Sequence, residues 1–241
     1  ESMEEIFSIL ADAGVARDEL YLAWDFNIAS VENITERILH IRDDAFASLG
    51  GAAPEFTVTE VVDLAPCSES GCESGQDQYK SRTIVGTFEV PNYLNSDSGA
   101  PGSPFFYDTP NDGLPDRLNG DNMFTARFYC SVARSVAEDF DVAPKAIARP
   151  SLYGHGLLGS GSEALRGTGA NVNIMADNHQ MMFCGSDWSG FSSEDAGYAI
   201  QALQDFSLLP AFFDRQQQGL CSITVRCTTM AIARAVFWAA R

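Results

Sequence analysis

Positive charge is scarce in this sequence of 241 residues. It has 15 Lys and Arg against 33 Asp and Glu, which gives a formal net charge of −18. Nucleic acids and anionic lipids are bound by basic surfaces, so neither is expected as a partner. A long apolar run is also missing, because Arg226 and Arg234 interrupt the apolar stretch 220–240, and no membrane span is expected. The apolar share of 45% is that of an ordinary folded domain.

Cysteine is sparse as well, with six residues, too few for a disulfide framework in a chain of this length. Cys67 and Cys72 nevertheless lie close together in a polar loop. Two explanations are open: a short-range disulfide, which we favour, and half of a zinc site, for which no second Cys/His pair of matching spacing exists. A disulfide favours an extracytoplasmic location, whether secreted, periplasmic or on the cell surface.

The hydrophobic periodicity changes along the chain, with mostly strands first and alternating helices and strands later. Strands are predicted over residues 20–26, 56–64, 82–94, 123–132, 145–153, from His179 onward and over 222–227. Helices are predicted over residues 2–14, 30–50 and 161–177, from an N-cap at Ser192 and from Thr229. This order predicts an α/β fold in which early antiparallel strands lead into parallel strands with flanking helices.

Three regions are expected. Residues 1–55 form an N-terminal helical segment with a short buried strand, 56–219 form the α/β core, and 220–241 form an atypical segment without any acidic residue. The lone His40 lies in a predicted helix and receives no functional role. The helix after Ser192 is expected to turn one apolar face to the core, formed by Ala196, Ala199, Ile200, Leu203 and Phe206.

An acidic loop follows at residues 108–122. Asp108, Asp112 and Asp116, with Gly113 at the sharp turn, resemble the calcium loops of thrombospondin-type repeats, and calcium prefers several hard oxygen ligands. Pro110 stands where those repeats place an acid. A series of Asx turns explains the same composition and is the favoured alternative.

Two glycine turns stand out between residues 149 and 195. One apolar strand ends in His155-Gly156, and the next ends in the run Asp187-Trp-Ser-Gly-Phe-Ser192. Together they resemble the α/β-hydrolase family, whose third strand ends in His-Gly and whose fourth ends in Asp-x-x-Gly-x-Ser. Residues 22–26, 112–121 and 153–159 are also similar to secreted bacterial esterase- or lipase-like proteins, and the resemblance covers about residues 20 to 219.

The resemblance implies a partial α/β-hydrolase-like sheet and an oxyanion-binding turn. The N–H of Leu157 would stabilise the oxyanion of acyl transfer, Gly156 would let the backbone approach, and His155 would orient the turn. Gly159, Asp187 and Trp188 would line the site, with Asp187 in a structural role. A glycine turn of an ordinary βαβ unit is the alternative explanation of the same residues.

The catalytic half of such a site is missing from the sequence. No Gly-x-Ser-x-Gly motif occurs, and the acid and His expected after it are absent. Cys227 or Thr228 could stand at a strand-to-helix turn like that of a nucleophile, but the glycines that make room for such a strained turn are missing there. The sequence therefore predicts part of a secreted ester hydrolase that is inactive alone, needs no cofactor and, once completed, acts on a small-molecule ester. A non-catalytic secreted domain that binds a ligand or calcium, and a truncated product without function, are the alternatives.

Overall fold

The computed structural model describes residues 3–50, 52, 54–109, 112–137, 146–166 and 171–224, with side chains up to residue 219. The chain divides into two compact units, Glu1–Glu36 and Arg37–Arg241. In the first unit, helix α1 (Met3–Asp12) is followed by a short 3-10 helix, η1 (Arg17–Glu19). Arg17 joins these two helices, because its guanidinium pairs with Glu4 and lies over the Phe7 ring.

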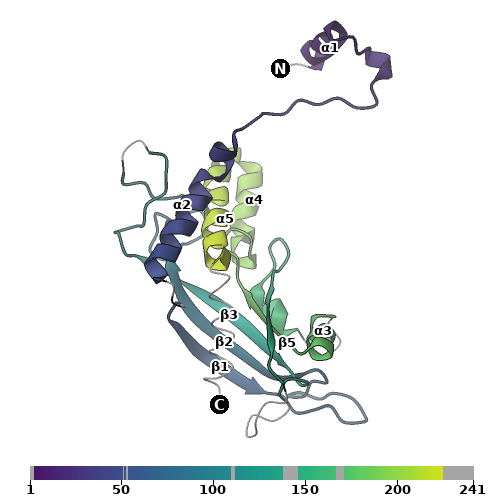
Figure 1. Cartoon of the computed structure of the whole chain (residues 1–241), viewed down its shortest axis with the longest axis vertical. Coiled ribbons are helices and arrows are strands. Elements are labelled where there is room, and N and C mark those ends of the chain that lie inside the picture. Colours follow the sequence, from purple (N-terminus) through teal and green to yellow (C-terminus); the bar gives the residue numbers. More distant parts are fainter. Residues whose placement is uncertain are drawn as a thin grey trace. The chain divides into compact units, whose positions relative to one another are not determined.

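The strand predicted over 20–26 is wrong. Residues 21–30 have no regular structure and form the extended stretch that precedes helix α2 (Val31–Leu49) (Figure 1). The apolar side chains of this stretch lie in solvent, and Trp24 and Phe26 are 66% and 74% exposed. The run is rich in apolar residues, but no strand of the described chain pairs with it, and a strand without a neighbour has no ladder to stabilise it. Helix α2 lies where the sequence predicts it, with the Ser30 hydroxyl accepting from the N–H of Asn33.

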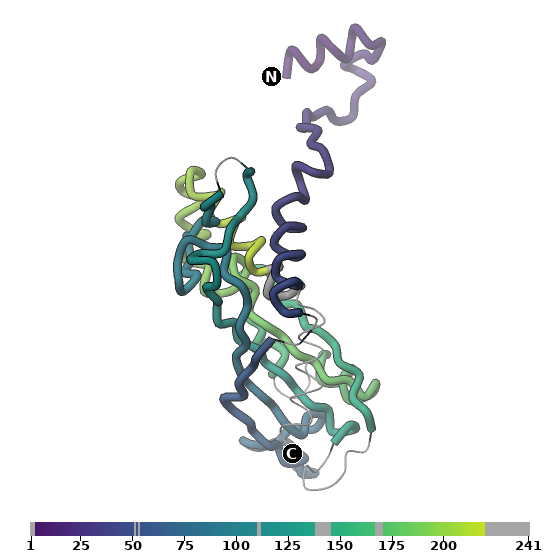
Figure 2. Tube along the Cα trace, turned by 60° about the vertical axis from the view of Figure 1, so that its left-hand side comes forward, coloured from purple at the N-terminus to yellow at the C-terminus, as the bar shows by residue number. Residues whose placement is uncertain are grey.

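A mixed sheet of five strands forms the centre of the second unit (Figure 1 and Figure 2). Its strands are β1 (Phe56–Asp63), β2 (Lys80–Pro91), β3 (Met123–Ala133), β4 (Arg149–Tyr153) and β5 (Met181–Ser186), in the order β1-β2-β3-β5-β4. The first three neighbouring pairs are antiparallel, and β4 and β5 are parallel. The predicted α/β architecture, antiparallel strands leading into a parallel pair with flanking helices, is confirmed.

Helices cover the sheet near β5 and gather at the end where β5 stops (Figure 1). The 3-10 helix η2 (Gly161–Leu165) and helix α3 (Asn171–His179) pack against β3 and β5. After β5 come η3 (Ser193–Asp195), α4 (Ala196–Gln204), η4 (Phe206–Leu208) and α5 (Leu209–Thr224). The buried apolar core between these layers includes Ile84, Phe88, Phe128, Val132 and Met182.

Three helix boundaries differ from the prediction. The helix predicted over 161–177 is η2 and α3, with residues 167–170 outside the described part. His179 ends α3 and does not begin β5, because Gln180 adopts a left-handed conformation (φ 55°) that terminates a helix. Residues 222–224 of the predicted strand 222–227 belong to α5, and 225–227 lie outside the described residues.

The predicted core face of α4 is also wrong. Ile200, Leu203 and Phe206 are 57–71% exposed, whereas Ala202 is buried. The buried residues of this face are Asp195, one position before the helix, and Ala202, seven positions later. They lie on the same side because seven residues make about two helical turns. A buried carboxylate sets the rotation of this helix, which a count of apolar residues could not reveal.

Two disulfides tie the second unit together. Cys130 and Cys184 lie directly opposite each other on β3 and β5 and form a buried disulfide between the strands. Cys67 and Cys72 form the short-range disulfide that the sequence favours, so they are not thiolate ligands of zinc.

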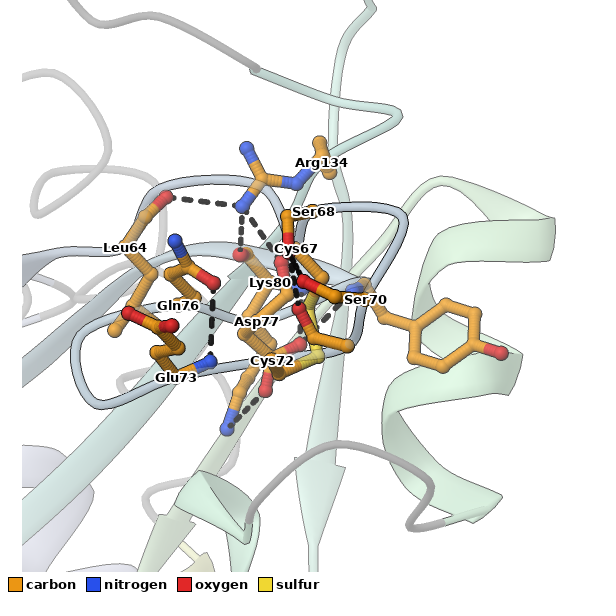
Figure 3. The surroundings of a disulfide bond; sticks show 12 residues. Leu64, Cys67, Ser68, Ser70, Cys72, Glu73, Gln76, Asp77, Lys80 and Arg134 are labelled. Carbon is orange, nitrogen blue, oxygen red and sulfur yellow. Dashed lines mark hydrogen bonds and ion pairs between the residues drawn. A yellow bond between two sulfur atoms is a disulfide. The ribbon is translucent and has the colours of Figure 1, made fainter.

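Figure 3 shows how the loop that carries the Cys67–Cys72 bond is fixed. The Arg134 guanidinium points into it, and Nη2 donates to the carbonyl oxygens of Leu64, Asp77 and Lys80 at 2.7–2.9 Å. The Lys80 ammonium donates to the carbonyl of Leu165, and its burial lowers the pKa of this amine despite the nearby Asp77 carboxylate. These cations fasten the loop to β3 and η2.

Candidate functional site

The two glycine turns of the sequence meet at one edge of the sheet. Because β4 and β5 are adjacent and parallel, the segments after both strands emerge at the same end. The turns are joined directly: the N–H of Leu158 donates to the carbonyl of Phe191 and the N–H of Ser193 to the carbonyl of Gly159, each at 2.7 Å. The structure therefore brings together residues about 30 positions apart in sequence, as a βαβ connection does.

His155 is the clamp between these turns. Its Nε2 accepts a hydrogen bond from the backbone N–H of Trp188 at 3.0 Å, so Nε2 carries no proton. Nδ1 therefore carries the hydrogen and donates to the carbonyl of Gly156 at 2.8 Å. The side chain is 7% exposed. With both ring nitrogens engaged, His155 positions the turns and has no free nitrogen to act as a base.

Leu157 lies on the exposed side of the turn that His155 holds. Leu157 is 65% exposed, and its backbone N–H has no hydrogen-bond partner among the described residues. The amides after it are engaged, because Leu158 donates to Phe191 and Gly159 donates to the carbonyl of Gly156 at 2.9 Å. Leu158 takes a left-handed conformation (φ 55°), which a leucine adopts only when its surroundings impose it. The turn thus holds the Leu157 N–H as an unoccupied donor on a fixed backbone.

Asp187 fastens the start of η2 to β3. Its Oδ1 accepts from the hydroxyl of Ser160 and the N–H of Gly161, at 2.9 and 2.8 Å, and its Oδ2 accepts from the hydroxyl of Tyr129 at 3.0 Å. Burial, together with the negative charge of Asp187, raises the pKa of the Tyr129 phenol. The carboxylate is occupied by structural contacts on both oxygens.

Helix α5 supports the second turn from behind. The Trp188 indole donates to the carbonyl of Gln216 at 3.0 Å and stacks at 5.0 Å from the ring of Phe191. It also lies against Gly219, where any Cβ would overlap the indole ring. This role of α5 was not predicted from the sequence. The signal was the glycine at the end of Asp-Arg-Gln-Gln-Gln-Gly (residues 214–219), since a glycine inside a helix often marks close packing.

A buried ion pair, also missed from the sequence, anchors the helix that leaves the site. Arg215 is 1% exposed, and its Nε lies 2.5 Å from Oδ1 of Asp195. The other carboxylate oxygen of Asp195 accepts from the Ser192 hydroxyl and, at 3.3 Å, from the Ser192 N–H, which completes a capping box. Ser192 is therefore committed to capping the helix.

No protein-family model, curated protein or solved structure matches this chain.

The residues of a nucleophile and its base do not meet in the described structure. No hydrogen bond among the described residues joins a Ser, Thr or Cys side chain to a histidine ring. His40 is bound to the carbonyl of Pro115 at 3.1 Å, and His155 is bound to backbone at both nitrogens. What this edge of the sheet can do chemically is present a hydrogen-bond donor to a developing negative charge.

The acidic loop is organised by its own backbone. Asp116 accepts from the N–H groups of Asp108 and Thr109 at 2.7 and 2.8 Å, and Asp112 accepts from the N–H of Leu114 at 2.9 Å. The Asp112 contact is an Asx turn, as in the alternative explanation, whereas the Asp116 contacts reach back seven and eight residues and close the loop. Among the described residues, no three His, Cys, Asp or Glu side chains gather as a metal site requires. Pro110 and residue 111 lie outside the described part. Among the residues that the structure describes, no helix is long and apolar enough to cross a bilayer.

Proposed function

We propose that this chain is the oxyanion-binding part of an ester hydrolase of the α/β-hydrolase type. The support is the arrangement of two motifs that the family places on its third and fourth strands. His155-Gly156 follows β4, the run from Asp187 to Ser192 follows β5, and the two strands are parallel neighbours. An ordinary βαβ turn has no need of a histidine that bonds both turns at once.

The observation that carries the proposal is the unpaired N–H of Leu157. Acyl transfer puts negative charge on the former carbonyl oxygen, and a preorganised backbone donor stabilises that charge without reorganising. The backbone around Leu157 is preorganised, because the His155 ring is bonded to the Trp188 N–H and the Gly156 carbonyl, and Leu158 is bonded to Phe191. Gly156 has no atom within 4 Å of the position of a Cβ, so the substrate has room at this point.

The chemistry needs a nucleophile that these residues do not supply. No Gly-x-Ser-x-Gly sequence occurs in the 241 residues. A second strand-to-helix turn, contributed by residues outside this sequence, would add the nucleophile and the second oxyanion donor. The chain by itself is then inactive, and its substrate in the complete enzyme is a small-molecule carboxylic ester.

The disulfides support an extracytoplasmic location for this hydrolase. Disulfides form and persist in oxidising compartments and are rare in the cytosol. The Cys130–Cys184 bond lies in the centre of the sheet, and the Cys67–Cys72 bond closes a polar loop.

Two experiments test the proposal. The 241-residue chain is expected to hydrolyse p-nitrophenyl butyrate no faster than buffer does. Turnover that disappears in Cys227→Ala would show that the chain carries its own nucleophile and would refute this account of the missing half. The coding sequence that follows residue 241 is the second test, because the proposal requires a Gly-x-Ser-x-Gly motif there.

In a gene product that includes such a motif, the oxyanion role is tested at a single backbone N–H. Leu157→Pro removes the N–H, and kcat is expected to fall by about 100- to 1,000-fold, the effect of losing one oxyanion donor. Leu157→Ala keeps the N–H and changes only the exposed side chain, so it is the matched control and should stay within about threefold of the parent. Equal losses in both variants would contradict the proposal.

A further inference from the structure

A second site lies away from the glycine turns, in a cavity of about 800 Å³. Small-molecule sites have volumes of roughly 300–1,000 Å³, so a ligand of the size of one or two sugar rings fits. Helix α2, the segment after β2 and residues 106–108 and 115–120 form its walls. The lining residues are His40, Asp44, Tyr93, Phe106, Asp108, Pro115, Asp116, Arg117, Asn119 and Gly120. No residue of either glycine turn is among them.

The polar walls of this cavity are fixed before any ligand arrives. The carboxylate of Asp44 accepts from Nε of Arg117 and from the hydroxyl of Tyr93, each at 2.6 Å. Nη2 of Arg117 also donates to the Asp44 carbonyl at 3.0 Å. Asp116 is held by two backbone N–H groups of its own loop. Fixed polar groups lower the entropic cost of binding a polar ligand.

Hydrogen-bond acceptors outnumber donors on these walls. His40 donates from Nε2 to the carbonyl of Pro115 at 3.1 Å. The Asp108 carboxylate and the Asn119 amide belong to exposed residues and have no side-chain partner among the described residues, whereas the Arg117 guanidinium is already paired with Asp44.

The cavity is also negatively charged. Burial alone would raise the pKa of Asp44, but the hydrogen bonds from Arg117 and Tyr93 outweigh it and lower that pKa. The backbone N–H of Thr109, with that of Asp108, lowers the pKa of Asp116. The carboxylates of Asp44, Asp108 and Asp116 thus face the Arg117 guanidinium and the His40 ring, in a chain whose net charge of −18 attracts cations.

We propose that this cavity binds a hydroxylated organic cation of the amino-sugar class. An ammonium group pairs with the Asp108 and Asp116 carboxylates, hydroxyl groups bond to the His40 ring and to the Asn119 amide, and the Phe106 ring covers the apolar face of the sugar. A neutral sugar leaves the Asp108 carboxylate without a cationic partner, and an anion is repelled.

Isothermal titration of the 241-residue chain with glucosamine tests this site, with glucose and N-acetylglucosamine as neutral ligands of related shape. Glucosamine is expected to bind about tenfold more tightly than either, the value of one charge-assisted hydrogen bond. Equal affinity for the three ligands, or no binding of glucosamine, would overturn the proposal.

Asp108→Asn removes the carboxylate that has no partner within the chain and should weaken glucosamine binding about tenfold without altering the fold. Asp112→Asn is the matched control. It is a neighbour in the same loop that does not line the cavity, and its amide oxygen can still accept from Leu114. A loss in Asp112→Asn equal to that in Asp108→Asn, or calcium chloride competing with glucosamine in both, would indicate a metal-binding loop in place of the proposed site.

Discussion

Replacing His155 by Phe is the most direct test of the clamp between the two glycine turns. Phenylalanine keeps the ring volume but removes both hydrogen-bonding nitrogens. The N–H of Trp188 then loses its acceptor beneath a buried ring, which costs about 1–3 kcal/mol, and the lost bond to the Gly156 carbonyl removes about 0.5–1.5 kcal/mol. We expect the free energy of unfolding to fall by about 2–4 kcal/mol.

Urea unfolding of the oxidised chain, followed by tryptophan fluorescence, measures this loss, and hydrogen exchange reports on the Trp188 amide. His155→Gln is the control, because its amide oxygen can take the place of Nε2 and should recover about half of the loss. A loss below about 0.5 kcal/mol in His155→Phe, with unchanged protection of the Trp188 amide, would show that the ring does not hold the turns.

Three further predictions concern packing, cross-links and acid stability. Gly161→Ala places a Cβ 2.5 Å from the backbone of β5 and should cost about 1–3 kcal/mol in thermal unfolding, whereas Gly197→Ala on open helix surface should gain about 0.4–1 kcal/mol. Replacing Cys130 and Cys184 by alanines should lower the free energy of chemical unfolding by about 4 kcal/mol, and the same change at Cys67 and Cys72 by about 2 kcal/mol. The Cys130–Cys184 bond stabilises more because it closes the longer loop, so equal losses would contradict this entropic argument. Because the pKa of Asp44 is lowered in the folded chain, its carboxylate stabilises the fold at pH values above the unfolded pKa of about 3.9, and this stability is lost as the pH falls through the folded pKa. Asp44→Asn should therefore flatten the acid side of a curve of unfolding free energy against pH.

The sequence was most informative where local pattern and burial agree. The runs that became β1, β2 and β3 alternate apolar and polar residues, and the order of elements gave the mixed α/β sheet. The two motifs at His155 and Asp187 were visible as glycine turns after apolar runs. That they meet follows from the parallel pairing of β4 and β5, which the sequence order only implied.

Features that depend on distant partners could not be predicted. The Cys130–Cys184 bond requires the register between β3 and β5, and the buried Asp195–Arg215 pair is invisible to a scale that treats charge as exposed. The segment 20–26 shows the opposite error, because its apolar run finds no partner strand in the described chain. The cavity beside His40 depends on three segments that only the fold brings together.

The disulfide between β3 and β5 has a mechanical consequence. These strands join the antiparallel part of the sheet to the parallel pair, and the bond encloses a stretch of 54 residues. A force applied between the two ends of the chain cannot extend that stretch while the bond is intact. Reduction would release roughly 190 Å of contour length, at about 3.5 Å per residue. Under load, the two glycine turns that follow β4 and β5 lie within or next to the part of the chain that the bond shields from tension.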